Sequence, residues 1–251
     1  MGAGGKAGAG VYQAIINEIP AHERYVELCA GHGGVLRRLR PAAGGAVAVD
    51  LDRVCCEYLR GLGRADVRVE QWDVVRWLAR RVLGLGTFVY CDPPYLASCR
   101  GDGGRGGPIY GCEMMAAWQH EALCAGLRGA RSRVAVSHPD CEEYRRYYGD
   151  WRQVGYSEPT RGGARETILW CNYPVPRELH DYRYVGSTYR EREGLARLQA
   201  RWIGRANAMP ARHRQALMAA LEEGVRRDGP GEEPGEEAPR EWRVEEAFGT
   251  E

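Results

Sequence analysis

Short apolar runs alternate with amphipathic segments along the first part of the chain. Four of the runs are rich in Val, Leu, Ala and aromatic residues and also contain an acidic residue. This pattern is typical of buried strands that carry a polar residue near the edge of a sheet. Strands that alternate with helices predict a parallel sheet covered by helices. The strands are expected at residues 25–30, 46–52, 67–73 and 87–92, and the helices between them at residues 35–39, 53–59 and 74–83.

The alternation continues through the middle of the chain. The last two apolar runs have no helix between them and are joined by a turn that contains Pro and Gly, which predicts an antiparallel pair at the sheet edge. Further helices are expected at residues 11–19, 113–127 and 141–148, and further strands at residues 133–137, 151–157 and 166–172.

Pro174 and Pro176 end the α/β pattern. Two amphipathic helices are expected after them, at residues 189–207 and 211–224, and Gly, Pro and Glu dominate from residue 226 onward. Such a composition buries too little apolar surface to fold. The expected regions are an α/β domain over residues 1–176, a helical extension over residues 177–225 and an acidic disordered tail over residues 226–251.

Composition narrows the class of protein. No apolar run reaches the roughly 18 residues that a membrane helix needs, and the N-terminal segment lacks the apolar core of a signal peptide. The nine cysteines include no C-x-x-C pair, which indicates reduced thiols rather than a disulfide framework or a structural zinc site. We therefore expect a cytoplasmic protein that binds no metal and no membrane.

Charge is distributed unevenly along the chain. Residues 222–251 contain eleven acidic residues and four Arg, whereas the preceding residues contain 23 acidic and 31 basic residues. A basic body suits a polyanionic partner such as nucleic acid. Of the 35 basic residues 34 are Arg, so the single lysine, Lys6, is conspicuous; a solvated terminal residue and a site residue are both open interpretations.

The candidate chemistry is concentrated in Asp92-Pro93-Pro94-Tyr95, which directly follows the fourth strand. Two prolines stiffen the backbone and prevent further strand pairing, so a carboxylate and a phenol are held at the carboxyl end of a strand. In open α/β sheets this is the end at which ligands bind.

The first three strands also carry polar features at this end. Gly31-His32-Gly33-Gly34 is a tight turn between a strand and a helix, where backbone N–H groups can approach a ligand. Its spacing is not G-x-G-x-x-G, so a dinucleotide is not the first expectation. Glu27, Asp50 and Asp73 could each serve as a helix N-cap, but with Asp92 they place four acids on one rim, which favours a ligand site.

A lysine-containing N-terminal segment, a glycine turn and Asp-Pro-Pro-Tyr follow one another along the chain. In this order they resemble the D12 class of DNA adenine N6-methyltransferases, the Dam-like enzymes, and in particular a short phage-type branch. The resemblance extends from about residue 4 to about residue 221 and implies a Rossmann-like seven-stranded methyltransferase sheet, mostly parallel with an antiparallel edge hairpin, plus a C-terminal helical extension. The shared blocks are Gly4-Gly5-Lys6, Glu27 to Gly34, Asp50, Asp92 to Tyr95, Tyr110 with His120 and Leu123, and Glu166 to Pro174.

The resemblance implies S-adenosyl-L-methionine as the cofactor. By the resemblance, the methionine part of the cofactor would be lined by Glu27, Gly31 and Gly33. Asp50 would bind the ribose hydroxyls, and Asp73 would bind the cofactor's adenine. Lys6 would lie near both the cofactor and the target base. The implied cofactor-binding residues are Lys6, Glu27, Leu28, Cys29, Ala30, Gly31, Gly33, Asp50, Leu51 and Asp73.

The implied reaction is direct methyl transfer to the exocyclic amine of a flipped adenine. This nitrogen is a weak nucleophile because its lone pair is delocalised into the ring. Asp92 and the backbone carbonyl of Pro93 can accept its two hydrogens, and Tyr95 can stack on the base. We expect positioning and electrostatics to supply most of the acceleration.

Two departures from the family affect what can be expected. The family usually has Pro-Phe where this chain has Leu28-Cys29. Only 18 residues separate Asp73 from Asp92, so the usual target-recognition insert is missing.

DNA contacts are therefore expected from the loop Ser98–Gly111 and from the helix at residues 189–207. An RNA or single-strand adenine methyltransferase and a non-catalytic nucleic-acid-binding protein on the same fold remain alternatives. The oligomeric state, monomer or dimer, stays open. The candidate DNA-binding residues are Arg100, Arg105, Arg197, Arg201 and Arg205.

Overall fold

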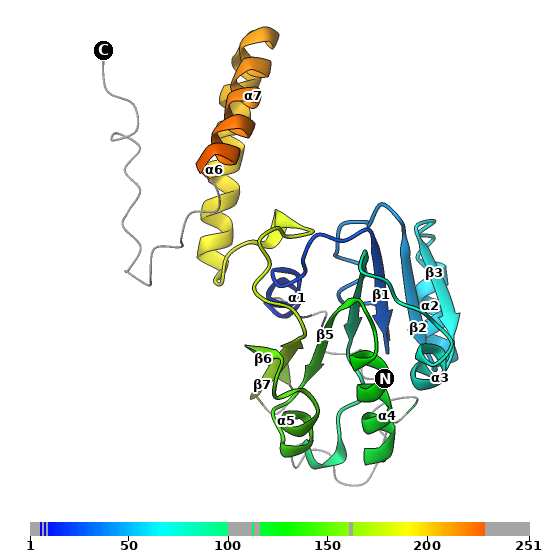
Figure 1. Ribbon diagram of the computed structural model, residues 1–251. Helices are drawn as coiled ribbons and strands as arrows, with labels where there is room; N and C mark the ends of the chain where they lie inside the picture. The colour runs from blue at the N-terminus through cyan, green and yellow to red at the C-terminus, as the bar shows by residue number, and fades with distance from the viewer. Residues whose placement is uncertain are drawn as a thin grey trace. The chain divides into compact units, whose positions relative to one another are not determined.

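A single seven-stranded sheet organises the computed structural model, which describes Lys6, Gly8, residues 10–99, Cys112, residues 116–160 and residues 163–228 (Figure 1). The strand order is β3-β2-β1-β4-β5-β7-β6. Strands β1 to β5 pair in parallel, and β7 runs antiparallel to both β5 and β6. This confirms the predicted Rossmann-like sheet with an antiparallel edge hairpin. The strands are β1 (Arg24–Leu28), β2 (Ala46–Asp50), β3 (Val67–Gln71), β4 (Thr87–Cys91), β5 (Arg133–His138), β6 (Arg152–Thr160) and β7 (Gly163–Cys171).

Helices follow the strands in the expected alternation. Asp52 and Asp73 cap two of them, because their side chains accept the backbone N–H groups of Val54 and Arg76. The helices are α1 (Val11–Ile16), α2 (Arg53–Gly61), α3 (Val74–Leu78), α4 (Ala117–Arg128), α5 (Glu142–Tyr148), α6 (Tyr189–Ala208) and α7 (Ala211–Asp228), with 3-10 turns η2 (Ala97–Cys99) and η4 (Tyr182–Tyr184).

Alternate residues of the central strands face two separate apolar cores. Tyr25 and Phe88 belong to the core that includes α1, α2 and the turns after β1. Val26 and Val89, one position further along, belong to the core that includes α3, α4 and α5. Burial on both faces explains why these strands are near-continuous apolar runs rather than alternating ones.

The segment after β1 differs from the expectation. A helix from Val35 was predicted, but residues 31–38 form consecutive turns. Arg37 and Leu39 make helix-like bonds to Gly33 and Val35, at 3.0 and 2.9 Å, yet the N–H of Leu36 is taken by the Glu27 carboxylate at 2.8 Å. Arg38 bonds to the third preceding carbonyl at 2.9 Å, and the N–H of Arg40 is taken by Asp181 at 3.0 Å, so no continuous α-helical ladder forms.

Two other boundaries also moved. The helix expected at residues 74–83 ends at Leu78, because Arg80 and Arg81 make tighter bonds to the third preceding carbonyl. Residues 226–228, assigned from composition to the disordered tail, instead close α7. The rest of that tail lies outside the described residues.

The described chain divides into two compact units, one ending at Arg197 and the other beginning at Leu198. The first unit continues past residue 176 because the segment around Leu179 returns to the body: Leu179 bridges Pro20, and buried Asp181 accepts the N–H of Arg40 at 3.0 Å. No helix in the described part of the chain is long and apolar enough to cross a membrane.

The strand order reverses between β1 and β4, which places a topological switch point there. The chain proceeds from β1 to β2 and β3 on one side and then returns to β4 on the other side of β1. The N–H of Asp92 donates to the carbonyl of Leu28 at 3.2 Å, so the ends of these two strands are joined. Ligands of open α/β sheets bind beyond this point.

Candidate functional site

The glycine turn after β1 and the end of β2 form one half of the rim. Asp50 accepts the N–H of Gly31 at 2.7 Å on one oxygen and that of Asp52 at 2.8 Å on the other. A carboxylate has about four acceptor positions, so two remain. Burial raises the pKa of Asp50, and the two backbone N–H donors oppose that rise.

Gly31 and Gly33 have different reasons to be glycine. Both have positive φ, 52° and 65°. A Cβ on Gly31 would project into open space, whereas one on Gly33 would lie 2.9 Å from Leu59 Cδ2. Gly31 therefore keeps a space clear beside Asp50, while Gly33 lets the turn pack against α2.

Cys29 has a φ of 53°, in the left-handed region that non-glycine residues adopt at a cost of about 1–3 kcal/mol. Leu28 before it is fully buried, and Ala30 after it donates its N–H to Val49 at 3.1 Å. The departure from the family's Pro-Phe thus falls on a strained position at the switch point.

Glu27 lies beneath the rim rather than on it. The residue is 2% exposed, and its Oε2 accepts both the Tyr25 hydroxyl at 2.7 Å and the Leu36 N–H at 2.8 Å. Burial raises its pKa to about 8, although these two hydrogen bonds oppose the rise. Glu27 therefore holds the turns after β1 in place, and its role toward a cofactor stays a prediction.

Asp73 and Leu51 lie on the outer part of the same rim. The Asp73 side chain accepts the N–H of Arg76 at 2.9 Å and caps α3. Leu51 follows β2 and is 47% exposed. Both positions are accessible, and their predicted contacts with a cofactor remain predictions.

Asp92 dominates the other half of the rim. Its Oδ1 is buried without a hydrogen-bond partner among the described residues, while 23% of the side-chain surface remains exposed. The exposed part of the side chain therefore lies away from Oδ1. Burial raises the pKa of Asp92, and the nearby Lys6 ammonium lowers it.

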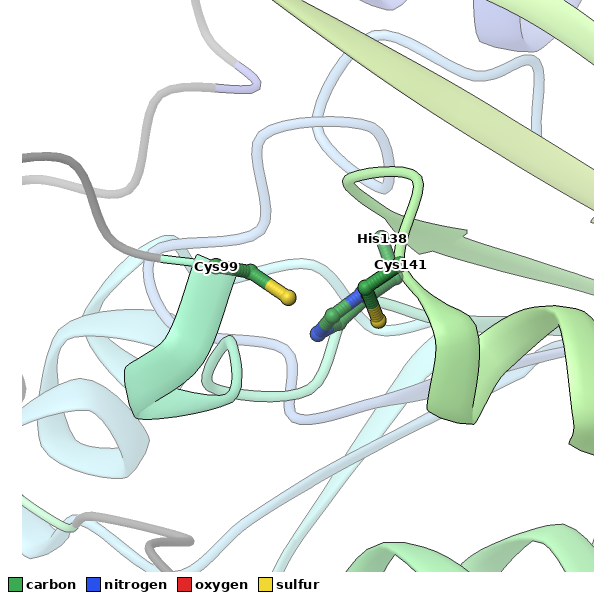
Figure 2. Close-up of side chains that lie close together, drawn as sticks. All are labelled: Cys99, His138 and Cys141. Carbon is green, nitrogen blue, oxygen red and sulfur yellow. The ribbon is translucent and has the colours of Figure 1, made fainter.

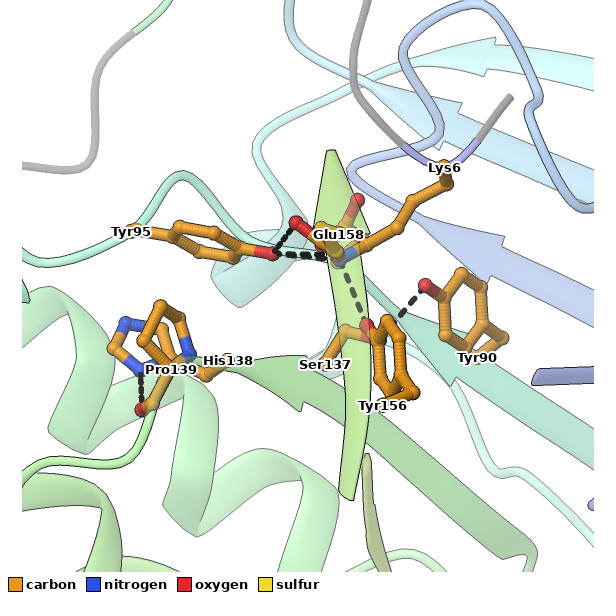
Figure 3. A network of polar contacts seen from close by, with 9 residues as sticks. Lys6, Tyr90, Tyr95, Ser137, His138, Pro139, Tyr156 and Glu158 are labelled. Atoms are coloured by element: carbon orange, nitrogen blue, oxygen red, sulfur yellow. Dashed lines mark hydrogen bonds and ion pairs between the residues drawn. The ribbon is translucent and has the colours of Figure 1, made fainter. Parts of the chain in front are cut away.

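Lys6 reaches this half from the N-terminal segment (Figure 3). It is 4% exposed, with Nζ 3.4 Å from Asp92 Oδ1. Nζ donates to the hydroxyls of Tyr95 at 2.6 Å and Tyr156 at 2.8 Å and forms a close ion pair with Glu158. Burial lowers the pKa of Lys6 to about 8, against the opposing effect of Asp92. The single lysine is thus buried among polar groups of the rim and is not a solvated residue, and its role toward a cofactor or base stays a prediction.

The polar network continues into the sheet. The Tyr156 hydroxyl donates to Ser137 Oγ at 2.9 Å, and Ser137 Oγ is 2.8 Å from the Tyr90 hydroxyl (Figure 3). Tyr90, Ser137 and Tyr156 come from β4, β5 and β6, so the Tyr156 hydroxyl that accepts from Lys6 is itself held by residues of the sheet.

The Tyr95 ring is enclosed on several sides. It is 4% exposed, with its edge toward His138 at 5.1 Å between centroids. Lys6 Nζ and the Arg165 guanidinium lie 5.3 and 5.7 Å from the ring centroid. A base that stacks on Tyr95, as expected from the sequence, therefore requires a shift of these side chains.

Glu158 was missed by the sequence reasoning. The sequence carries a partial signal, because Val154, Tyr156 and Glu158 occupy alternate positions; in the structure Tyr156 and Glu158 are buried while Ser157 between them is exposed. A carboxylate in phase with inward-facing residues needs a buried partner. Arg100 and Arg105 lie outside the described residues, whereas Arg197, Arg201 and Arg205 are exposed on α6.

Cys99, His138 and Cys141 come together near Tyr95, with ligand atoms within 4.8 Å of one another (Figure 2). Linear spacing gave no sign of this cluster. His138 Nε2 accepts the N–H of Leu96 at 3.1 Å, and Nδ1 is 2.8 Å from the Pro139 carbonyl. Burial lowers the pKa of His138 to about 3. The imidazole is therefore neutral, and both nitrogens already have backbone partners.

Comparisons with known proteins give fold-level matches. No family model matches the chain, and no curated protein matches it in sequence. Among solved structures, a spermidine synthase from Thermotoga maritima is 11% identical with a TM-score of 0.45, over 66% of this chain and 60% of that chain.

Two further matches are similar in extent. A magnesium protoporphyrin IX methyltransferase from Synechocystis, solved with bound SAM, is 14% identical with a TM-score of 0.41, over 64% of this chain and 75% of that chain. An RNA methyltransferase candidate from Pyrococcus horikoshii is 14% identical with a TM-score of 0.41, over 65% of this chain and 81% of that chain. Such matches concern the fold and carry no information on substrate.

Proposed function

We propose that this chain is an S-adenosylmethionine-dependent methyltransferase that methylates the exocyclic N6 amine of adenine in DNA. The observation that carries the proposal is Asp92: a carboxylate at the switch point, followed by two prolines, close to a lysine charge and partly open at the rim. A carboxylate in this setting is suited to accept hydrogens from a neutral amine.

The glycine-turn half of the rim fits the proposed cofactor. Asp50 retains acceptor positions for two vicinal hydroxyls, and the space beside Gly31 would be filled by any Cβ there. S-adenosylmethionine, when bound, supplies an electrophilic methyl group on a sulfonium. The acid at the end of β2 and the glycine turn at the end of β1 would hold it beside Asp92.

The Asp92 half would prepare the amine. The Asp92 carboxylate accepts one N–H, the carbonyl of Pro93 accepts the other, and the nitrogen lone pair is then directed away from the ring system. When the new N–C bond forms, the bond between the methyl and the sulfonium sulfur would break and the nitrogen would lose one proton, for which the Asp92 carboxylate is the proposed acceptor. Lys6 favours the ionised form of Asp92 against the effect of burial, because an opposite charge lies 3.4 Å from the carboxylate.

The target base and its polymer are inferred from the Asp-Pro-Pro-Tyr resemblance and the basic composition. RNA or single-stranded DNA would use the same carboxylate, and so both are tested as substrates. A non-catalytic binding protein would have no need for an ionised, partly open Asp92 beside a glycine turn.

The deciding experiment uses cofactor with a labelled methyl group. The full chain is incubated with duplex DNA, single-stranded DNA or RNA, and nucleosides are identified after digestion. Label in N6-methyldeoxyadenosine from the duplex, absent with Asp92→Ala, is the expected result. Label in RNA alone would reassign the substrate, and no label in any nucleic acid would leave a binding protein.

A further inference from the structure

Glu158 is a buried acid that the proposed reaction leaves unexplained. It is 5% exposed near the tip of the β6–β7 hairpin, where its cross-strand partner is Arg165. Burying a carboxylate is costly unless it is paired. Its ion pair is with Lys6, 152 residues away in sequence, rather than with any neighbour on β6.

The acceptors around Lys6 outnumber its donors. An ammonium has three N–H groups. The Tyr95 hydroxyl, the Tyr156 hydroxyl and Glu158 Oε1 all lie closer to Nζ than Asp92 does, at 3.4 Å. The three N–H groups are therefore used elsewhere, which agrees with the lack of a hydrogen bond at Asp92 Oδ1 within the described chain.

We propose that Glu158 is a positioning residue that holds the Lys6 ammonium near Asp92 while keeping its N–H groups off that carboxylate, a role that rests on the methyl-transfer reaction proposed above. Asp92 then gains the electrostatic benefit of a nearby cation without losing acceptor capacity to it. The edge hairpin becomes part of the catalytic site, although it carries none of the expected site residues.

Removing the Glu158 charge has two consequences. Lys6 loses its closest counter-ion, so its charged form becomes less favourable and its pKa falls below the present value of about 8. The ammonium that remains can turn an N–H toward Asp92 and weaken it as an acceptor. The titratable and charged groups that face Lys6 are Asp92, Tyr95, His138, Tyr156, Glu158 and Arg165.

The single lysine makes the first test direct, because one side-chain amine reports on one site. The rate of Lys6 acylation is measured against pH in the full chain, and tandem mass spectrometry separates Lys6 from any α-amine. We expect Glu158→Gln to lower the pKa of Lys6 by about one unit or more, the range typical of a lost opposite charge. Glu158→Asp, which keeps the charge, should restore at least half of that shift.

Glu166→Gln is the matched control, since Glu166 lies on the same hairpin, is exposed and loses the same charge. It should leave the pKa of Lys6 within about 0.3 units, given the screening of exposed charges. An unchanged pKa in Glu158→Gln, or an equal shift in Glu166→Gln, would overturn the proposal. Thermal melting of each variant verifies that the fold is intact.

Kinetics separate this proposal from the reaction on which it rests. In Glu158→Gln we expect kcat to fall about tenfold with little change in KM, and the alkaline limb of the pH–rate profile to move to lower pH along with Lys6. A shifted Lys6 pKa with no methyl transfer even in the wild type would contradict the proposed function but not the pairing. If Glu158→Gln shifts the pKa of Lys6 but keeps the wild-type kcat, the positioning role of Glu158 is contradicted.

Discussion

The two halves of the rim are stabilised in opposite ways. In the glycine-turn half, Asp50 and Asp73 are bonded by backbone N–H groups, one of them only two residues away and the most distant 19. In the Asp92 half, the contacts of Lys6 span 89, 150 and 152 residues and join side chains. One half is built by local backbone geometry, the other by tertiary structure.

This difference has energetic consequences. In the glycine-turn half the acids are bonded by backbone N–H groups, which are present whenever β1 and β2 pair. A single side-chain change in this half should therefore remove one ligand contact and little else. The second half is a buried polar network, in which loss of one member leaves others unsatisfied. Substitutions in the Asp92 half should therefore have larger effects, and effects that depend on one another.

The largest effect is expected for Asp92. Asp92→Ala removes the acceptor for the substrate amine and leaves Lys6 near one carboxylate instead of two. Methyl transfer should fall by about a hundredfold or more, a loss typical of a key electrostatic contact in a transition state. Calorimetry should show cofactor affinity within about twofold of wild type, because the proposed cofactor contacts belong to the other half.

Asp92→Asn is the companion variant, since an amide is a weaker acceptor than a carboxylate. It too should be strongly impaired. Turnover within about threefold of wild type in both variants would remove Asp92 from the mechanism and with it the contrast between the halves.

The same contrast explains what the sequence could predict. The alternation of strands and helices, the parallel sheet and the edge hairpin depend on local periodicity, turn residues and the rules for parallel sheets, and these predictions were confirmed where the structure describes them. The turns at residues 31–38 were missed because one of the bonds that prevents a longer helix, from the Arg40 N–H to Asp181, joins residues 141 apart in sequence.

Glu158 escaped prediction for a similar reason. Reading it as a site residue requires the register of β6 and the return of the N-terminal segment to the sheet, and neither is local. Lys6 could be singled out as the one lysine, but whether it was buried could not be decided without its partners. The cluster of Cys99, His138 and Cys141 likewise joins η2 to the end of β5.

Glu27 sharpens the comparison, because it is a buried acid in the locally built half. Its folded-state pKa of about 8 exceeds the ordinary value of 4.5. Such a group contributes stability that is complete below pH 4.5 and is lost as pH rises toward 8. Glu27→Gln keeps an acceptor for Tyr25 and Leu36 without the charge. Between pH 5 and pH 8 the free energy of unfolding of the wild type should therefore fall by roughly 3 kcal/mol more than that of the variant.

Urea unfolding of both proteins at these two pH values measures the difference. Comparing them cancels the contributions of His22 and His138, whose pKa values burial lowers. Parallel pH dependence in the two proteins would show that Glu27 is ionised in the fold and is available to a ligand after all.

Asp50 tests the first half itself. Asp50→Ala should weaken cofactor binding about tenfold to thirtyfold, because hydrogen bonds to a charged group contribute about 1.5–3 kcal/mol. At saturating cofactor, kcat should change little. The cofactor affinity of Asp73→Ala can be compared with that of Asp50→Ala, since Asp73 lies on the outer rim, where it caps α3. Unchanged affinity in Asp50→Ala, measured by calorimetry, would refute the assignment of this half to the cofactor.

The smallest effect is expected for α6. Arg197, Arg201 and Arg205 are exposed at four-residue spacing, so they share one helix face. Arg197 pairs with Glu193 at 2.5 Å, and Arg205 lies 5.3 Å from the Trp202 ring centroid. Neutralising all three with Gln should weaken DNA binding about three- to tenfold, equally for all sequences, and reduce the salt dependence by up to about 0.9 per lost phosphate contact.

The control neutralises three exposed arginines elsewhere, Arg60, Arg80 and Arg131, and so changes the net charge equally. If that variant loses as much affinity as the α6 variant, attraction by overall charge accounts for binding. If the α6 variant binds as tightly as wild type at every salt concentration, the helix does not contact DNA. Arg165, beside Tyr95 at the rim, would then be the next candidate for a phosphate contact, which ties substrate binding to the half assembled by tertiary structure.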